Sequence, residues 1–355
     1  MARTASISEV ISSAAARVLD AQPSVSVQLR IARDILGDHD LTALASARGI
    51  AANHPARAML RNVEFRERDV WMRTDVGGCV RGGVDDAFRA ALNAGLTQSD
   101  PLMQERIAET ATFIELCEEE TPWEDEALHG QKRHTKFGYI TDLPGALSCV
   151  APSHPIVVRY RDMATQQIKA HLRTGDFSVE SEEALWPGIY GTKLASTRFF
   201  EAYRQYDFWN THHPHVFGWH AFRLVGSDSS GLTEKERSRY YDMAVGYKEW
   251  GGTEWTSRII AHDFPKPDRY AQAVALQFEA FCDMQLYPYW RRNAALFVEW
   301  VVDQRRPDGL WDFGVPHNGF GSATLAKISE SWRGRHRALD WTTHVLLLLK
   351  RYMES

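Results

Sequence analysis

Hydrophobic residues recur at helical spacing along most of this chain, and alternating runs of β-branched residues are nearly absent. Apolar side chains three and four positions apart share one face of a helix, so this pattern predicts amphipathic helices rather than strands. The clearest cases lie at residues 101–119, 156–172, 270–286 and 339–352. The sequence therefore predicts an all-α protein.

A weaker helical periodicity of apolar residues is present in other parts of the chain. It predicts helices at residues 7–19, 25–36, 41–52, 84–94, 193–206, 234–247 and 290–304. The total is about eleven or twelve, and Gly, Pro or Asp/Asn clusters separate most of them. Two stretches, 121–155 and 207–231, are predicted to be irregular, and they are rich in aromatic, His and Pro residues rather than in linker residues. We expect a single domain spanning residues 1–355.

Charge and composition exclude several classes of protein. The net charge is −5 and there is no dense Lys/Arg block, so we do not expect nucleic-acid binding. The four cysteines lie far apart and form no CxxC pair, which favours thiols over a disulfide framework or a zinc ribbon. The longest apolar run, 345–349, is too short for a membrane span, and residues 1–20 do not read as a secretory signal. We therefore expect a cytoplasmic protein.

One motif near the C-terminus resembles a known family. Gln304, Gly309 and Trp311 follow the order Gln, four residues, Gly, one residue, Trp. This spacing resembles the QW motif of squalene and oxidosqualene cyclases and of related prenyltransferase-type α/α barrels. Residues 23–37 resemble an inner-helix repeat of such barrels, and residues 329–352 resemble the terminal hairpin of uncharacterised prenyltransferase-like proteins. The resemblance implies an (α/α)6 barrel, in which the motif Gln caps an outer helix near the motif Trp.

The same resemblance implies an activity. It is acid-initiated cyclisation or rearrangement of a small isoprenoid or other hydrophobic substrate in a central aromatic cavity. The Asp-x-Asp-Asp acid of class II cyclases is matched only by Gly83-Val84-Asp85-Asp86, which lacks the first Asp. The Asp-x-Cys zinc pair and the Asp-Asp-x-x-Asp magnesium motif of related enzymes are absent. We therefore expect no metal and no other cofactor, and Mg²⁺ has no motif support.

Three acids near one another are candidates for the proton donor. Asp85 and Asp86 follow Gly82-Gly83 at an expected helix start, where carboxylates also cap backbone N–H groups and offset the helix dipole. Two close carboxylates do not both ionise easily, so one of them could keep a proton and deliver it to an alkene or epoxide. Asp75, in the glycine-rich segment 75–83, is an alternative acid.

A second candidate pair opens the last expected helix. Asp340 and His344 are four residues apart, so their side chains would face the same way. They could form an acid–base pair or provide two metal ligands. The alternative is that Asp340 is an N-cap and that His344 is packed or solvent-facing.

The most unusual segment is an aromatic and histidine-rich stretch at 206–220. Aromatic faces attract cations and suit a cavity around a developing carbocation, so we predict that this stretch lines the substrate pocket. Loop packing at the mouth of the barrel is an equal alternative, and the spacing of the histidines fits no known zinc site. The candidate substrate-binding residues are Tyr206, Phe208, Trp209, His212, His213, His215, Phe217, Trp219 and His220.

Two other functions remain open at this point. Glycan hydrolases, lyases and epimerases use the same kind of barrel, and the twelve Trp and twelve Tyr residues suit sugar stacking. A non-catalytic helical scaffold that binds a partner protein is the third alternative. The sequence does not define the oligomeric state.

Overall fold

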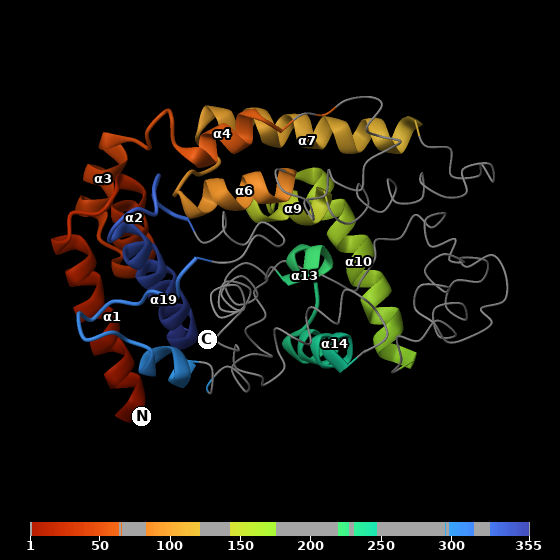
Figure 1. The fold of residues 1–355 in the computed structure, drawn as a ribbon. Coiled ribbons are helices and arrows are strands. Elements are labelled where there is room, and N and C mark those ends of the chain that lie inside the picture. Colours follow the sequence, from red (N-terminus) through yellow and green to blue (C-terminus); the bar gives the residue numbers. More distant parts are fainter. Residues whose placement is uncertain are drawn as a thin grey trace.

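The computed structural model describes residues 2–63, 65, 83–120, 143–174, 219–226, 231–246, 295, 298–315 and 327–354. Every regular element in these ranges is a helix (Figure 1). The all-α prediction is therefore confirmed for the part of the chain that the structure describes. Among these residues no helix is long and apolar enough to cross a membrane.

The N-terminal part is one long helix followed by several short ones. It contains α1 (Ala2–Asp20), α2 (Val25–Arg30), the π-helical turn η1 (Ile31–Leu36), α3 (His39–Arg48) and α4 (Pro55–Arg61). The Ser24 side chain accepts a hydrogen bond from the Val27 N–H to begin α2, and Asp38 accepts one from Leu41 to begin α3. These side chains satisfy N–H groups that have no partner within the helix.

The middle and C-terminal parts contain both short and long helices. They are α6 (Val84–Asn93), α7 (Pro101–Glu120), α9 (Leu143–Val150), α10 (Pro155–Thr174), α13 (Trp219–Gly226), α14 (Glu234–Gly246) and α19 (His336–Glu354). Proline begins both α7 and α10, where its missing N–H costs no hydrogen bond.

Most predicted helices that fall on described residues are found. The predictions at 7–19, 25–36, 84–94, 101–119, 156–172, 234–247 and 339–352 correspond to α1, α2 with η1, α6, α7, α10, α14 and α19. The prediction at 41–52 corresponds to α3 but continues past the end of that helix at Arg48. The described part of 290–304 is helical at 295 and 298–303. The predictions at 193–206 and 270–286 lie outside the described residues.

The prediction of irregular structure at 121–155 and 207–231 is wrong at two places, because α9 lies in the first stretch and α13 in the second. Helix α9 contains Pro144 and Gly145, residue types that indicate a helix end in sequence reasoning. Seven of its eight residues are buried, so packing against neighbouring helices outweighs the low intrinsic propensity.

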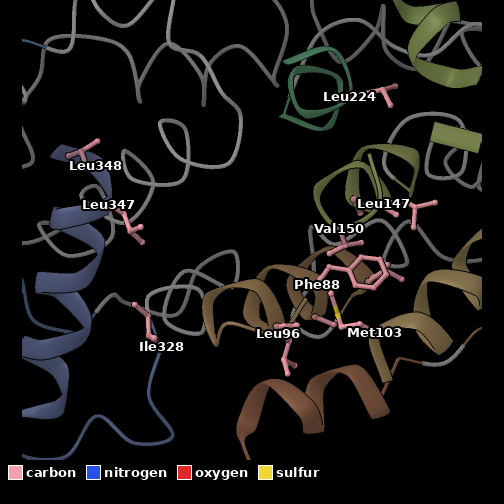
Figure 2. Close-up of a cluster of buried hydrophobic side chains, with 14 of the residues drawn as sticks. Phe88, Leu96, Met103, Leu147, Val150, Leu224, Ile328, Leu347 and Leu348 are labelled. Atoms are coloured by element: carbon pink, nitrogen blue, oxygen red, sulfur yellow. The ribbon is translucent and has the colours of Figure 1, made fainter. Parts of the chain in front are cut away.

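A continuous hydrophobic core joins these helices. Phe88 of α6, Leu147 and Val150 of α9 and Leu224 of α13 meet on one side of it (Figure 2). Leu348 of α19 belongs to the same core and is fully buried.

The two ends of the chain lie side by side, because α1 packs against α19 (Figure 1). Helix α19 also contacts α2 and η1. Farther along, α4 packs on α6 and α7, α6 on α9, α9 on α10 and α13, and α10 on α14. Neighbours along the described chain are thus mostly neighbours in space, and the last helix meets the first.

Candidate functional site

A buried cluster of four charged residues lies at the start of α6. Asp85 and Asp86 occupy its first turn, and Arg89 follows one turn later. Arg223 of α13 completes the cluster, although it is 138 residues away from Asp85. All four side chains are buried, with residue exposures between 2% and 5%.

Both carboxylates are bonded to arginine. The Arg89 Nη2 atom lies 3.2 Å from an Asp85 oxygen and 3.0 Å from an Asp86 oxygen, so one guanidinium bridges the two acids. Arg223 donates to the other oxygen of Asp85 through its Nη1 atom. The described part of this network thus contains two carboxylates and two guanidinium groups.

The local sequence explains the position of Arg89 but not that of Arg223. Residues three and four apart share a helix face, so Arg89 reaches Asp86 and Asp85 from within α6. The position of Arg223 depends on how α13 is held. Arg161 of α10 fixes that helix by donating to the Leu224 carbonyl at 2.9 Å, and it also donates to the Pro152 carbonyl at 2.9 Å.

Burying these four charged groups is unfavourable in free energy. Removing each charged group from water costs several kcal/mol, and pairing returns only part of that cost. Hydrophobic residues of similar size are often at least as stabilising as a buried ion network.

A second buried acid, Asp340, lies in the second turn of α19 and is fully buried. Its Oδ2 atom accepts hydrogen bonds from the Ile328 N–H at 2.9 Å and the Trp332 Nε1–H at 2.6 Å. Ser329 contributes its N–H at 3.1 Å and its hydroxyl at 2.9 Å to the same oxygen. Burial raises the pKa of Asp340 to about 7, although these hydrogen bonds oppose the shift.

Asp340 and His344 contact different groups in the structure. Helix α19 begins at His336, so Asp340 is not the N-cap that the sequence suggested. His344 lies edge-on to the Trp341 ring, with 6.0 Å between ring centroids. Trp341 in turn contacts Phe313 at 5.4 Å and Trp332 at 6.0 Å, so aromatic rings surround this part of α19.

A Ser–His contact also lies near this acid. Ser26 Oγ is 3.3 Å from His54 Nε2, a pairing found in serine nucleophiles. His54 Nδ1 accepts the Ala56 N–H at 3.2 Å, so the neutral ring carries its proton on Nε2. That nitrogen faces the Ile328 carbonyl at 3.1 Å and cannot take a proton from Ser26 in this tautomer. The pair is therefore arranged for structure rather than for nucleophilic catalysis.

The motif Trp forms a junction between helices. Trp311 is fully buried, its Nε1–H donates to the Val301 carbonyl at 2.7 Å, and its backbone N–H donates to Thr342 of α19 at 2.9 Å. The Arg305 guanidinium lies 5.4 Å from the Trp311 ring centroid. Gly309 makes the preceding turn with a φ of +81°, and a Cβ there would meet the Arg17 side chain at 2.8 Å. The motif thus joins α1, α19 and the helix ending near residue 303.

Most of the predicted pocket residues and the alternative acid Asp75 lie outside the described residues. The pocket residues concerned are Tyr206, Phe208, Trp209, His212, His213, His215 and Phe217. Trp219 and His220 are the first two residues of α13, the helix that carries Arg223. The structure therefore brings the end of the aromatic segment and the Asp85–Asp86 pair to neighbouring helices.

Two residues of the acid cluster were missed in the sequence. Arg89 could have been found, because its spacing from Asp85 and Asp86 is that of an ion pair on a helix. Arg223 carries no such signal, because only the folded chain brings it to α6. Among the described residues no group of three or more His, Cys, Asp and Glu side chains could hold a metal ion.

No protein-family profile, curated protein or solved structure matches this chain. What defines the chain is therefore its own geometry: its described part is helical, and there Asp85 and Asp86 contact Arg89 while Arg223 contacts Asp85.

Proposed function

We propose that this chain closes into an (α/α)6 barrel and acts as an isoprenoid cyclase-like enzyme. The reaction is acid-initiated cyclisation or rearrangement of a hydrophobic, terpenoid-type substrate. The buried Asp85–Asp86–Arg89–Arg223 cluster carries this proposal, since a helical protein has no structural need for so costly a group of charges.

The packing order supports a ring. Several described helices contact a near neighbour in the chain, as α4 contacts α6 and α6 contacts α9, and α19 contacts α1 (Figure 1). A row of helices stacked in an open array would instead keep its first and last members apart. The QW-like turn at 304–311 supports the same architecture, because Trp311 joins two helical segments near the place where the ring closes.

The cluster supports the division of roles between the two acids. Asp85 contacts both guanidinium groups, so we assign it as the ionised partner. Asp86 shares Arg89 with Asp85, and we assign it as the proton donor. Close carboxylates raise each other's proton affinity, which is the property that an acid catalyst needs.

Trp219 and His220 support the pocket assignment. They begin α13, and Arg223 lies one turn farther along the same helix. The aromatic segment that they end would supply ring faces to stabilise cationic intermediates. The small hydrophobic substrate would then lie between the start of α6 and the segment preceding α13.

The test is turnover of isoprenoid diphosphates. Purified protein is incubated with geranyl, farnesyl and geranylgeranyl diphosphate, with and without Mg²⁺, and products are identified by mass spectrometry. We expect a product from the natural chain and at least a hundredfold loss in Asp86→Asn, of the order expected for removing a general acid (about 10²–10⁴-fold). Asp100→Asn is the matched control, because Asp100 pairs with Arg57 in a different place. Absence of turnover with all three substrates would remove the proposal.

A further inference from the structure

Helix α13 depends on its neighbours for its position. It has eight residues, Trp219–Gly226, and the backbone carbonyls of its last turn have no partner within the helix. A helix of this length has little stability by itself in water, so its contacts with α9 and α10 hold it in place (Figure 1). The contact between Arg223 and Asp85 therefore depends on how α13 is fixed.

Arg161 of α10 bonds to the last turn of α13. Its Nε–H donates to the Leu224 carbonyl at 2.9 Å, so it satisfies one of these carbonyls from outside the helix. A guanidinium at this end also interacts favourably with the helix dipole. Leu224 is fully buried, and the hydrogen bond is buried as well, so water would not readily replace the arginine.

The same guanidinium is held at a second carbonyl. Its Nη2–H donates to the Pro152 carbonyl at 2.9 Å, in the connection between α9 and α10. Arg161 is buried, and the N–H groups of a guanidinium lie in one rigid plane. Arg161 thus joins α13 to the α9–α10 connection with little freedom to adjust.

The hydrogen bond from Arg161 and the contact with Asp85 lie one residue apart on α13. Leu224 accepts from Arg161, and the preceding residue, Arg223, donates to Asp85. A movement of α13 that breaks the first contact also displaces the second, because both residues belong to the same helical turn. The displacement would reach the acid that contacts both arginines of the cluster.

We propose that Arg161 is a positioning residue of the acid cluster, which keeps Arg223 against Asp85 by fixing the last turn of α13. Arg161 acts on the acids through Arg223 and is not itself a proton donor. The effect of Arg161 on turnover rests on the function proposed above. Its coupling to Asp85 is a property of the fold and is measured without any substrate.

A double-mutant cycle between Arg161 and Asp85 tests the coupling. Chemical denaturation of the full chain gives the unfolding equilibrium constant for Arg161→Met, Asp85→Asn and the double variant. In the natural chain Asp85→Asn leaves Arg223 held beside a neutral partner, whereas in Arg161→Met the arginine of α13 can move away. We therefore expect Asp85→Asn to change the equilibrium constant by about fivefold less in the Arg161→Met background.

Asp312→Asn is the matched control, because Asp312 pairs with Arg337 at 2.7 Å in a different part of the described chain. It should have the same effect in both backgrounds, within about twofold. Equal effects of Asp85→Asn in both backgrounds would overturn the proposal, since an arginine that only packs α10 on α13 gives additive losses. If Arg161→Met does not fold, Arg161→Lys takes its place in the cycle with the same criterion, because lysine keeps the charge but lacks the rigid fork of donors.

Turnover is the second readout. On the isoprenoid diphosphate that the natural chain converts, the folded Arg161 variant should have a kcat lower by about tenfold to a hundredfold with little change in KM, because misplaced catalytic groups slow the chemical step. A natural kcat in this variant would overturn the positioning role. A natural chain that converts no isoprenoid removes the proposed function instead, and the cycle alone then decides the role of Arg161.

Discussion

Arg223 carries a charged side chain that is fully buried and contacts Asp85. In Arg223→Leu, the buried Asp85 loses the guanidinium of α13 and keeps its contact with Arg89, which also contacts Asp86. We expect a loss of about 3–5 kcal/mol in the free energy of unfolding, the usual cost of an uncompensated buried charge. Chemical denaturation of the variant and the natural chain measures this difference.

The double variant Asp85→Leu/Arg223→Leu provides the internal control. It removes one charge of each sign and leaves Arg89 with Asp86, so we expect it to recover most of the loss. Arg306→Leu is the exposed comparison, because its pair with Asp308 is nearly half exposed, and we expect a change of no more than about 1 kcal/mol. Equal losses in the single and double variants would show that the cluster is not a coupled network.

His54 makes the stability of the fold depend on pH. Burial lowers the pKa of His54 below the ordinary value of 6.5, so the unfolded chain binds a proton more readily than the folded one. Its contribution is therefore complete above about pH 6.5 and is lost as the pH falls through and below that value. A protonated Nδ1 would also lose the hydrogen bond from Ala56 that begins α4.

His54→Asn isolates this effect, because Asn is a good N-cap that does not titrate. We expect the variant to be less stable than the natural chain above neutrality, by about 1–2 kcal/mol for the lost contact to Ile328. This difference in the free energy of unfolding should narrow as the pH is lowered toward about 5. Only the natural chain is then destabilised by protonation of a buried histidine. Thermal denaturation across this range measures it, and a gap that widens on acidification would contradict the assignment.

At the scale of elements, α19 holds the two ends of the chain together. Leu348 is fully buried in the core that α19 shares with the other helices (Figure 2). Leu348→Ala should therefore cost about 2–5 kcal/mol in the free energy of unfolding. Leu44→Ala on α3 is the matched control, because Leu44 is 63% exposed, and it should cost less than about 0.5 kcal/mol. If Leu348→Ala lost as little stability as Leu44→Ala, α19 would not belong to the core.

Sequence periodicity predicted the long amphipathic helices and missed the short buried ones. Helix α10 shows an apolar stripe that can be read directly, whereas α9 is buried on nearly all sides and contains Pro144 and Gly145. Its helical state depends on neighbours that sequence reading does not include. The same limit applies to the site: Asp85 and Asp86 were predicted as a pair, but their partner Arg223 comes from a helix that was not predicted.

For the molecule as a whole, the central claim is that the buried acid–arginine cluster serves function rather than stability. The core is continuous from α1 to α19, so the fold does not need buried charges to hold its helices together. In the proposed barrel the cluster would lie beside the substrate, where its electrostatic cost is balanced by its use in catalysis.

The most direct measurement combines turnover and stability in Asp85→Leu/Arg223→Leu. Product formation from the isoprenoid diphosphate that the natural chain converts is measured beside chemical denaturation of the same sample. The account predicts a folded variant of nearly natural stability whose turnover has fallen at least a hundredfold, because Asp86 loses the neighbouring carboxylate that raises its proton affinity and no longer acts as an effective general acid (about 10²–10⁴-fold). A folded variant that turns over substrate at the natural rate would contradict it.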